Sequence, residues 1–454
     1  MRRLIMSWII STLVLFSAAA SAENINLLTL LGSGGTITLN AANTYYTPYE
    51  YNIPANAHII GNGAHISIQG GPVKSNVTGR LLKIENCVIA STSAWCALGA
   101  TNGGILELTD VEVSSPGGAA AYVKDSTGRF TRTTFRNGTF GLQSGGVCSI
   151  TLTDSSMSNC GLSYYQVQGS CAWNGGTVIQ PGGSAVTFHE SVAVNVSGIT
   201  ITMTQNGSLA VQYSGTSQGS FLNSTITGVS HGIYVQHGTV LVDHCNLSCP
   251  FPWKGGAGPG VACTGSGNIT VRDTVFTGFE NAVQVNKQIP PGTALVEDCI
   301  FNNVEVSCLS CRGASNVMFR RNNCLTPKQD SVYLMESSGI VEDNLFVGTL
   351  NTCVALLNCT DSIIIRNNHF EAAVDQSVAV VEGSRNVLIT RNTLMSGIIA
   401  NIFVDPTSKA TSTENILYNP PDTNVRVHGG ELYSFANLNA EAPFGCEVRQ
   451  GGIL

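Results

Sequence analysis

The chain repeats the six-residue stretch Phe319-Arg-Arg-Asn322-Asn-Cys324 in four further variants. Each copy places two polar residues before an asparagine and an apolar residue two places after it. The further copies read Val341-Glu-Asp-Asn344-Leu-Phe346, Ile365-Arg-Asn-Asn368-His-Phe370, Ile389-Thr-Arg-Asn392-Thr-Leu394 and Ser412-Thr-Glu-Asn415-Ile-Leu417. Their asparagines lie 22, 24, 24 and 23 residues apart. A fixed period in the twenties predicts a solenoid, and short β-branched segments between Gly, Asn and Ser turns predict coils made of strands.

One coil is too thin to bury its own apolar face, so coils must stack, with strands about 4.8 Å apart. Equivalent positions then form columns along the solenoid. We expect the asparagine column to be a ladder in which each side-chain amide bonds to neighbouring coils, because buried polar groups must be satisfied. The column two places later is apolar and is expected to stack in the core. It comprises Phe276, Phe301, Cys324, Phe346, Phe370 and Leu394.

The pattern extends towards the N-terminus with other residues in the asparagine position. These earlier copies begin at Ile84, Leu108, Phe130, Leu152, Phe221, Val242, Val271 and Val296. A second strand follows in each coil, with its first and third residues inward, as in Ile233-Tyr-Val235. Parallel strands joined by crossovers coil right-handedly. The sequence therefore predicts an all-β fold, a single-stranded, right-handed parallel β-helix (β-solenoid) of about a dozen coils with terminal caps.

The outward residues of this second strand carry no charge. We assign them as Tyr234, Gln284, Leu309, Tyr333, Ala355, Ala379 and Phe403. Such a face offers aromatic surface on which a sugar ring can stack, but little acid–base chemistry.

The chain divides into four segments. Residues 1–22 have the two arginines, the apolar run and the Ala-Ser-Ala ending of a secretory signal peptide. Residues 23–70 are expected to hold the N-terminal cap and first coils, with a short apolar helix within residues 24–31 closing the bottom of the core. Residues 71–419 hold the β-helix repeats, and residues 420–454 are expected to fold over the top as a C-terminal cap. We expect no membrane span in the mature chain and a secreted, periplasmic or cell-surface location.

Charged residues are scarce, with 22 Lys and Arg against 29 Asp and Glu in 454 residues. A chain this poor in basic residues has no electrostatic footprint for nucleic acid or an anionic membrane. The chain also contains 15 cysteines. In an exported protein some of them would pair, but Cys87, Cys245 and Cys299 occupy the ladder position, where cysteine serves as a small buried hydrophobe.

The N-terminal stretch reads Gly34-Gly35-Thr-Ile-Thr-Leu39 and then Ile53-Pro54-Ala-Asn-Ala-His-Ile-Ile-Gly61-Asn-Gly63. Together with the coil length and the asparagine column, it resembles the pectate-lyase-like superfamily of right-handed parallel β-helices. The resemblance covers most of the mature chain and implies the fold. It does not single out an activity, because the superfamily includes lyases, hydrolases, epimerases, esterases, phage tailspikes and non-catalytic surface proteins.

One tetrad, Val242-Asp243-His244-Cys245, resembles the segment of pectate lyases whose aspartate helps to hold calcium. The resemblance implies that Asp243 is a metal ligand and that calcium is the cofactor. The companion Asp-Gly and Arg-x-Pro-x-x-Arg segments of pectate lyases are missing from the sequence. The alternative is that Asp243 and His244 fill the outward positions of an ordinary coil.

Acidic residues recur at the neighbouring turns. Asp273 and Asp298 take the position of His244 in the next two copies, so their carboxylates would stack. Close carboxylates bind a cation or raise one pKa, which makes Asp243, His244, Asp273 and Asp298 the candidate catalytic residues. The preceding position instead alternates in sign and favours a cross-strand ladder of ion pairs. It reads Arg272, Glu297, Arg320, Glu342 and Arg366.

Two segments break the rhythm and carry aromatic residues, at 161–184 and 250–260. Inserted loops of solenoids often form the binding face, and exposed aromatic rings suit sugars. We therefore predict that Trp253, Trp173 and Tyr165 bind substrate, together with Tyr234 of the second strand. The alternative is that the loops fold back over the solenoid.

These observations favour an exported β-helix that binds a polysaccharide or cell-surface glycan. Processing by lyase, hydrolase or epimerase chemistry would need a catalytic set that the motifs do not supply. The competing class is a non-enzymatic surface, adhesive or structural β-solenoid. The sequence leaves open whether the protein is an enzyme and what its oligomeric state is.

Overall fold

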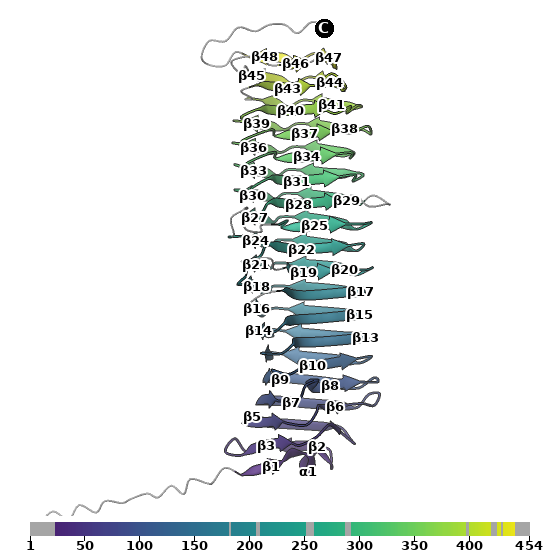
Figure 1. Cartoon of the computed structure of the whole chain (residues 1–454), viewed down its shortest axis with the longest axis vertical. Helices are drawn as coiled ribbons and strands as arrows, with labels where there is room; N and C mark the ends of the chain where they lie inside the picture. The colour runs from purple at the N-terminus through teal and green to yellow at the C-terminus, as the bar shows by residue number, and fades with distance from the viewer. Residues whose placement is uncertain are drawn as a thin grey trace, which may run out of the picture.

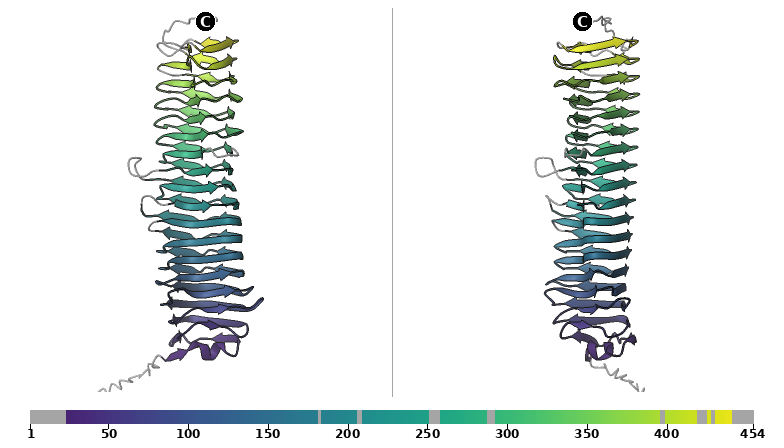
Figure 2. Two further views of the ribbon diagram at one scale, coloured as in Figure 1. Left: turned by 45° about the vertical axis from the view of Figure 1, so that its right-hand side comes forward. Right: turned by 90° about the vertical axis from the view of Figure 1, so that its right-hand side faces the viewer.

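The computed structural model is a rod of about 17 turns in which parallel strands of successive coils stack in columns (Figure 1). The structure describes residues 23–180, 183–205, 209–250, 258–286, 292–395, 399–418, 425–427 and 430–440. Two further views show the strands aligned along a nearly straight axis (Figure 2). We name the three columns of strands stack A, stack B and stack C, and each coil passes through C, A and B in that order.

Stack A contains the strand that opens the repeated pattern. Its own strands are β2 Gly35–Thr38, β11 Thr127–Thr131, β20 Gln218–Leu222, β23 Thr239–Asp243, β26 Asn268–Arg272, β29 Thr293–Glu297, β32 Val317–Arg320, β35 Gly339–Glu342, β38 Ile363–Arg366, β41 Val387–Thr390, β44 Lys409–Thr413 and β47 Glu431–Phe435.

Stack B contains the short strand that closes the pattern. Its own strands are β1 Asn24–Asn26, β3 Thr44–Thr47, β12 Thr134–Arg136, β14 Ser156–Ser158, β16 Thr177–Gln180, β18 Thr200–Met203, β21 Thr225–Thr227, β24 Asn246–Ser248, β27 Val275–Thr277, β30 Ile300–Asn302, β33 Asn323–Leu325, β36 Leu345–Val347, β39 His369–Glu371, β42 Thr393–Leu394, β45 Ile416–Tyr418 and β48 Leu438–Ala440.

Stack C contains the second predicted strand of each coil. Its own strands are β4 Tyr51–Asn52, β6 Val73–Ser75, β8 Cys96–Thr101, β10 Ala119–Lys124, β19 Leu209–Tyr213, β22 His231–Gln236, β25 Val261–Thr264, β28 Asn281–Asn286, β31 Ser307–Arg312, β34 Val332–Met335, β37 Val354–Leu357, β40 Gln376–Val381, β43 Ala400–Val404 and β46 Val425–Val427.

Six longer strands bend around a corner and serve two stacks. Those that run from stack A into stack B are β5 Ala57–Ile68, β7 Leu81–Ser91 and β9 Ile105–Ser114. Those that run from stack C into stack A are β13 Phe140–Thr153, β15 Leu162–Asn174 and β17 Ser184–Ser197. Residues 161–180 and 183–184 therefore continue the coils and do not form the inserted loop that the sequence predicted at 161–184.

One residue with positive φ turns the chain from stack A into stack B in most coils. It is the third residue of the repeat, as at His244 (φ 51°), Asp273 (φ 46°) and Asp298 (φ 56°). Asn and Asp tolerate this left-handed conformation better than most residues, which explains their frequency at this position. The side chains of His244, Asp273 and Asp298 are exposed, so this corner of the rod presents one turn side chain after another to solvent.

The asparagines of the repeat lie in one buried column and bond to one another. The Asn344 Nδ2 donates to Asn368 Oδ1 at 2.9 Å and to the Phe319 carbonyl of the preceding coil at 2.9 Å. The Asn344 backbone N–H donates to the same Asn368 oxygen at 3.0 Å. Each amide thereby joins three coils, and the same contacts recur from Asn322 to Asn437. In earlier coils, hydroxyl groups take this position, at Thr133, Ser155, Ser224 and Thr274.

The predicted apolar column lies in the core, which confirms that prediction. Phe276 and Phe301 stack with ring centroids 5.2 Å apart, and Phe346 and Phe370 stack at 4.9 Å with nearly parallel rings. Cys324 fills the gap between these two pairs and is fully buried.

Stack C confirms the inward and outward alternation, with one correction. Ile233 and Val235 are buried while Tyr234 between them is partly exposed. Leu309 is not an outward residue, because it pairs with the inward Val283 and is fully buried. Two consecutive residues, Cys308 and Leu309, face inward here, so the outward residue of this coil is Ser310.

The two ends of the rod differ from one another. Helix α1 Leu27–Leu31 buries three leucines at the bottom, as the sequence predicted, and Asn26 caps it by accepting a hydrogen bond from the Leu28 N–H. At the other end, residues 425–440 do not fold over the top, because β46, β47 and β48 extend the three stacks by one more coil. Residues 1–22 and 441–454 lie outside the described part. No helix within the described part is long and apolar enough to cross a membrane.

The charged column of stack A forms separate pairs. Arg272 lies 2.8 Å from Asp243, Arg320 lies 2.7 Å from Glu297, and Arg366 lies 2.6 Å from Glu342. The predicted cross-strand ion pairs therefore form, and each of these arginines pairs with the carboxylate of the preceding coil.

All fourteen cysteines within the described ranges are buried, and none of them is in a disulfide. Burial raises the pKa of Cys87 and of Cys353 to about 12. They act as small core residues, and the disulfides expected of an exported chain do not form among them.

Candidate functional site

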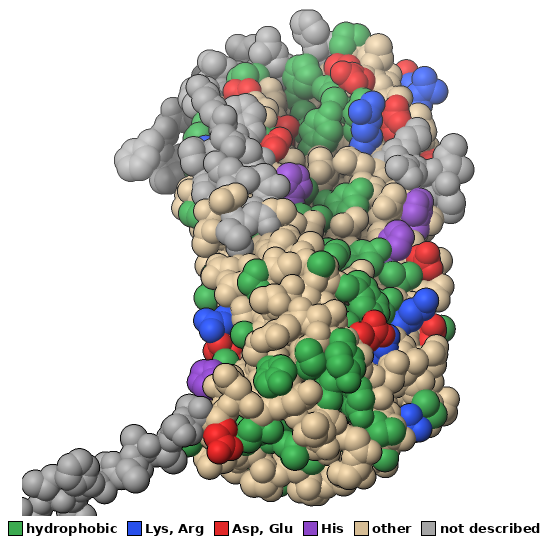
Figure 3. All heavy atoms as spheres, turned by 60° about the horizontal axis from the view of Figure 1, so that its bottom comes forward, with side chains coloured by type: hydrophobic (Ala, Val, Ile, Leu, Met, Phe, Trp, Pro, Cys, Tyr) green, Lys and Arg blue, Asp and Glu red, His purple; other side chains and the backbone are tan. Residues whose placement is uncertain are grey.

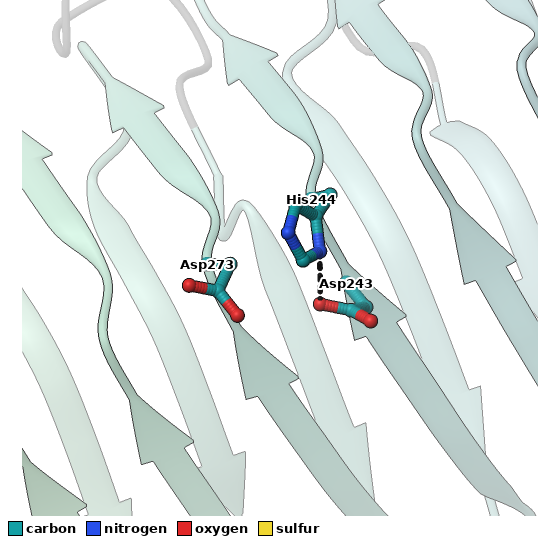
Figure 4. Close-up of side chains that lie close together, drawn as sticks. All are labelled: Asp243, His244 and Asp273. Carbon is teal, nitrogen blue, oxygen red and sulfur yellow. Dashed lines mark hydrogen bonds and ion pairs between the residues drawn. The ribbon is translucent and has the colours of Figure 1, made fainter.

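The best-formed polar cluster lies where β23 and β26 leave stack A and consists of Asp243, His244 and Asp273 (Figure 4). The His244 Nδ1 lies 2.7 Å from Asp243 Oδ1. One side-chain atom from each of the three residues falls within 4.8 Å of the others. Asp243 ends its strand and is 11% exposed, while His244 occupies the turn and is 61% exposed. The repeat thus places a nearly buried carboxylate behind an accessible imidazole.

Arg272 completes the surroundings of Asp243. Its Nη2 donates to Asp243 Oδ2 at 2.8 Å, so both carboxylate oxygens have a donor. Burial raises the pKa of Asp243, but the hydrogen bonds from Arg272 and His244 outweigh it and bring the pKa below its ordinary value. The carboxylate is therefore ionised at neutral pH.

A calcium ion does not fit this donor set. Calcium takes six to eight oxygen ligands, whereas this cluster offers two carboxylates and a ring nitrogen, and one carboxylate is already bound by Arg272. Binding at Asp243 would bring the cation against a guanidinium charge. The geometry suits proton transfer better, because a carboxylate on Nδ1 fixes the tautomer in which Nε2 is free to accept a proton.

Asp298 stands apart from this cluster. The Arg321 guanidinium donates two hydrogen bonds to the Asp298 carboxylate, from Nε to Oδ1 at 2.8 Å and from Nη2 to Oδ2 at 2.7 Å. These bonds lower the pKa of Asp298. A bidentate arginine engages both oxygens of this carboxylate and stabilises the turn, and Asp298 does not belong to the cluster of Asp243, His244 and Asp273. Its catalytic role stays a prediction.

A shallow groove of about 820 Å³ crosses the outer face of stack A from β13 to β26. Small residues such as Ala172 and Gly219 form its floor, and hydroxyl and amide groups such as Thr151 and Asn195 line it. A Cβ atom at Gly219 would lie 1.8 Å from the Val194 carbonyl oxygen, so a larger residue cannot replace this glycine without a shift of the backbone. Arg272, the partner of Asp243, lies at the last strand of the groove.

A second feature is a column of uncharged side chains along the outer face of stack C. Strand register places one such residue in every coil from Gly99 to Phe403. The column reads Gly99, Tyr122, Gln143, Tyr165, Thr187, Gln212, Tyr234, Ala262, Gln284, Ser310, Tyr333, Ala355, Ala379 and Phe403. In a space-filling view that brings the bottom of the rod forward, uncharged side chains cover most of the visible surface, with a few charged ones among them (Figure 3).

The tyrosines of this column are partly exposed. Tyr165 lies against His189, with ring centroids 6.5 Å apart, and the Tyr234 hydroxyl bonds to Thr264 Oγ1 at 2.9 Å. Both therefore take the accessible position that binding requires. Tyr122 belongs to the same column as Tyr165 by the register of β10 with the following coil, although no repeat in the sequence marks it.

The predicted role of Trp173 is wrong. Its ring is 1% exposed and packs edge-on against Tyr164 at 5.9 Å, while its Nε1 donates to the Gly175 carbonyl at 2.9 Å. An inward position of β15 explains this, since the segment is a strand and not a loop. Trp253 lies outside the described residues.

Comparison with known proteins assigns the chain to a family. The family model for the right-handed β-helix region matches residues 95–276 and 253–394. No curated protein matches the sequence. Similar solved structures include the periplasmic alginate epimerase AlgG, at 10% identity over 91% of this chain and 87% of that chain, with a TM-score of 0.34. PfbA, a surface adhesin of Streptococcus pneumoniae, is 13% identical over 70% and 85% of the two chains, with a TM-score of 0.39. A mutant tailspike protein of E. coli bacteriophage HK620 is 13% identical over 87% and 72%, with a TM-score of 0.31.

Proposed function

The chain belongs to the right-handed β-helix family, and from that premise we propose that it is an exported rod whose stack C face binds a polysaccharide. The uncharged column carries this proposal. In the coils from Gly99 to Phe403, the central outward position of stack C is never occupied by Asp, Glu, Lys or Arg.

The column has the chemistry that an extended sugar chain requires. Tyr122 and Tyr165 lie two coils apart and Tyr234 lies three coils further, which corresponds to about 10 and 15 Å along the rod. Each ring gives a flat apolar face and a hydroxyl group. Between them, the side-chain amides of Gln143 and Gln212 supply donors and acceptors. A chain lying along the axis would meet stacking and hydrogen-bonding groups in turn.

The absence of charge in this column favours a neutral polysaccharide. Recognition of uronate or sulfate groups uses arginine or lysine, and the column contains neither from Gly99 to Phe403. Strand register places Lys74 and Arg426 in the coils next to its two ends. Export follows from the signal peptide expected at residues 1–22.

Binding of the purified protein to a panel of neutral and acidic polysaccharides tests the proposal. We expect Tyr234→Ala to weaken binding of a neutral chain about tenfold and the double variant Tyr165→Ala/Tyr234→Ala about a hundredfold, since each stacked ring contributes on the order of 1 kcal/mol. Tyr433→Ala is the control, because Tyr433 is 59% exposed but lies on stack A. Equal binding by all four proteins would refute the assignment, and a lack of binding to every polysaccharide would favour an adhesive or structural role.

One observation favours a second candidate function, the processing of a chain bound in the stack A groove. The Asp243–His244 pair has the arrangement of a general base, and its partner Arg272 lines the groove. New reducing or unsaturated ends in the same panel, lost in His244→Ala without loss of binding, would support it. If no polysaccharide of the panel gains new reducing or unsaturated ends, the cluster of Asp243, His244 and Asp273 has only a structural role at the turn.

A further inference from the structure

A ridge of aliphatic side chains continues along stack A beyond the groove. It consists of Leu295, Met318, Ile340, Ile364 and Leu388, which pair directly across adjacent coils. All five side chains are partly exposed. Five coils give a ridge roughly 20 Å long. A contiguous apolar strip of this kind on an outer sheet face marks an interaction surface.

The margins of the ridge are polar. On one side runs the column of alternating charge, Asp243, Arg272, Glu297, Arg320, Glu342 and Arg366. On the other side, uncharged residues such as Asn316 and Asn386 precede the strands. An apolar centre with a polar rim is the composition of a protein interface, and the strip lacks the aromatic rings that a sugar chain prefers.

The alternating column is complementary to itself when one copy is reversed. Consider a two-fold axis perpendicular to the rod that passes between Glu297 and Arg320. It places Arg320 opposite Glu297 of a second copy, Glu342 opposite Arg272, and Arg366 opposite Asp243, so that every facing pair has opposite charges. The same operation places Met318 opposite Leu295 on the ridge. It places the remaining ridge residues opposite groove-side residues of the second copy, namely Ile340 opposite Thr270, Ile364 opposite Leu241 and Leu388 opposite Ser220.

We propose that two copies of this chain pack antiparallel through stack A, with the Leu295–Met318 end of the aliphatic ridge beside the two-fold axis and the charged column facing itself. The interface is isologous, so each contact occurs twice and the assembly closes at two copies. Each ion pair within one chain gains a second partner from the other chain. The tyrosines of stack C lie on another face of the rod and stay accessible in the dimer.

Light scattering of the chain as it elutes from a sizing column measures the assembly directly. We expect twice the monomer mass at micromolar concentration for the unaltered protein, and the monomer mass for Met318→Glu, which places two carboxylates at the centre of the interface. Leu350→Glu is the control, because Leu350 is 56% exposed in a turn away from stack A. A monomeric unaltered protein, or a dimer that Met318→Glu leaves intact, would overturn the proposal.

Two charge exchanges test the antiparallel register. The exchange Glu342→Arg/Arg366→Glu keeps the pair within the chain but sets like charges opposite Arg272 and Asp243 of the second copy, so we expect at least tenfold weaker dimerisation. The exchange Glu297→Arg/Arg320→Glu keeps opposite charges both within and between the copies, so the dimer should persist. Both variants should keep the unfolding midpoint of the parent within a few degrees. Equal weakening by both exchanges, or by neither, would overturn the register.

Discussion

Two regions of the rod follow the same backbone path but differ in the side chains that bond at the corner between stacks A and B. The first region comprises the coils from Asn322 to Asn437, and the second comprises the coils from Phe140 to Thr274. In the first region a buried amide joins three coils at every corner. In the second region a hydroxyl or thiol takes that place, as at Ser155 and Cys245. The groove and the Asp243–His244 pair belong to the second region. The comparison teaches that the fold does not depend on asparagine at the corner, which leaves the corner residues of the middle coils free to differ.

The largest expected effect comes from breaking the amide column. Asn368→Leu removes the acceptor of the Asn344 amide and the donor to Asn392 and Val341, and leaves buried polar groups unpaired. We expect it to lower the free energy of unfolding by about 3 kcal/mol, against about 1 kcal/mol for Ser155→Ala in the other region. Chemical denaturation measures both. Equal losses would mean that the amide column adds nothing beyond ordinary hydrogen bonds.

A smaller effect is expected from extending the column by one coil towards the other region. Cys299 lies next in line, and its backbone N–H already donates to Asn322 Oδ1 at 2.9 Å. In Cys299→Asn the new amide can donate to Asn322 and to the Val271 carbonyl, which the thiol now faces at 3.8 Å. We expect stabilisation by about 1 kcal/mol in the same denaturation assay. A loss of stability would show that this corner is too tightly packed to hold an amide.

The smallest effect concerns the acid limit of stability. The folded pKa of Asp243 is lowered, so its contribution is present above its unfolded pKa of about 3.9 and is lost as pH falls through the folded value. In thermal unfolding from pH 6 down to about pH 2.5, we expect Asp243→Asn to flatten this loss by about 1 kcal/mol or less. Asp298→Asn should act in the same direction but more weakly, since that carboxyl is more exposed. If Asp243→Asn leaves the pH dependence of the unfolding temperature unchanged, the ion pair between Asp243 and Arg272 does not contribute to stability.

The sequence was sufficient to predict the stacking but not the number of coils. The spacing of Asn322 to Asn415 predicts the period, and the buried Phe276 and Phe370 follow from it. The coils around Trp173 escaped recognition because glycines take the turn position and no asparagine marks the corner. The last coil escaped although Asn437 lies 22 residues after Asn415, because Phe435 and Ala436 replace the two polar residues that precede the asparagine in the repeat.

The candidate site was predictable only in part, for a physical reason. Sequence spacing places Asp243, His244 and Asp273 on one corner, and the structure brings them together. The spacing of the sequence does not show which of the turn carboxylates forms an ion pair with an arginine. In the structure, Asp298 accepts a hydrogen bond from Arg321 of the next coil. In coils that lack the six-residue repeat, the period does not show which side chains point into the core. For this reason the sequence predicted an exposed Trp173, which is buried, and gave no sign that Tyr122 faces outward.

Radical footprinting of tyrosine side chains tests whether a polysaccharide lies along the stack C column. The unaltered protein is oxidised briefly with and without the tightest-binding neutral polysaccharide, and oxidation of each tyrosine is read by mass spectrometry. The account predicts that Tyr122, Tyr165, Tyr234 and Tyr333 become protected together, while Tyr433 on stack A reacts as before. Protection confined to stack A, or unchanged oxidation of all four column tyrosines in the bound protein, would contradict it.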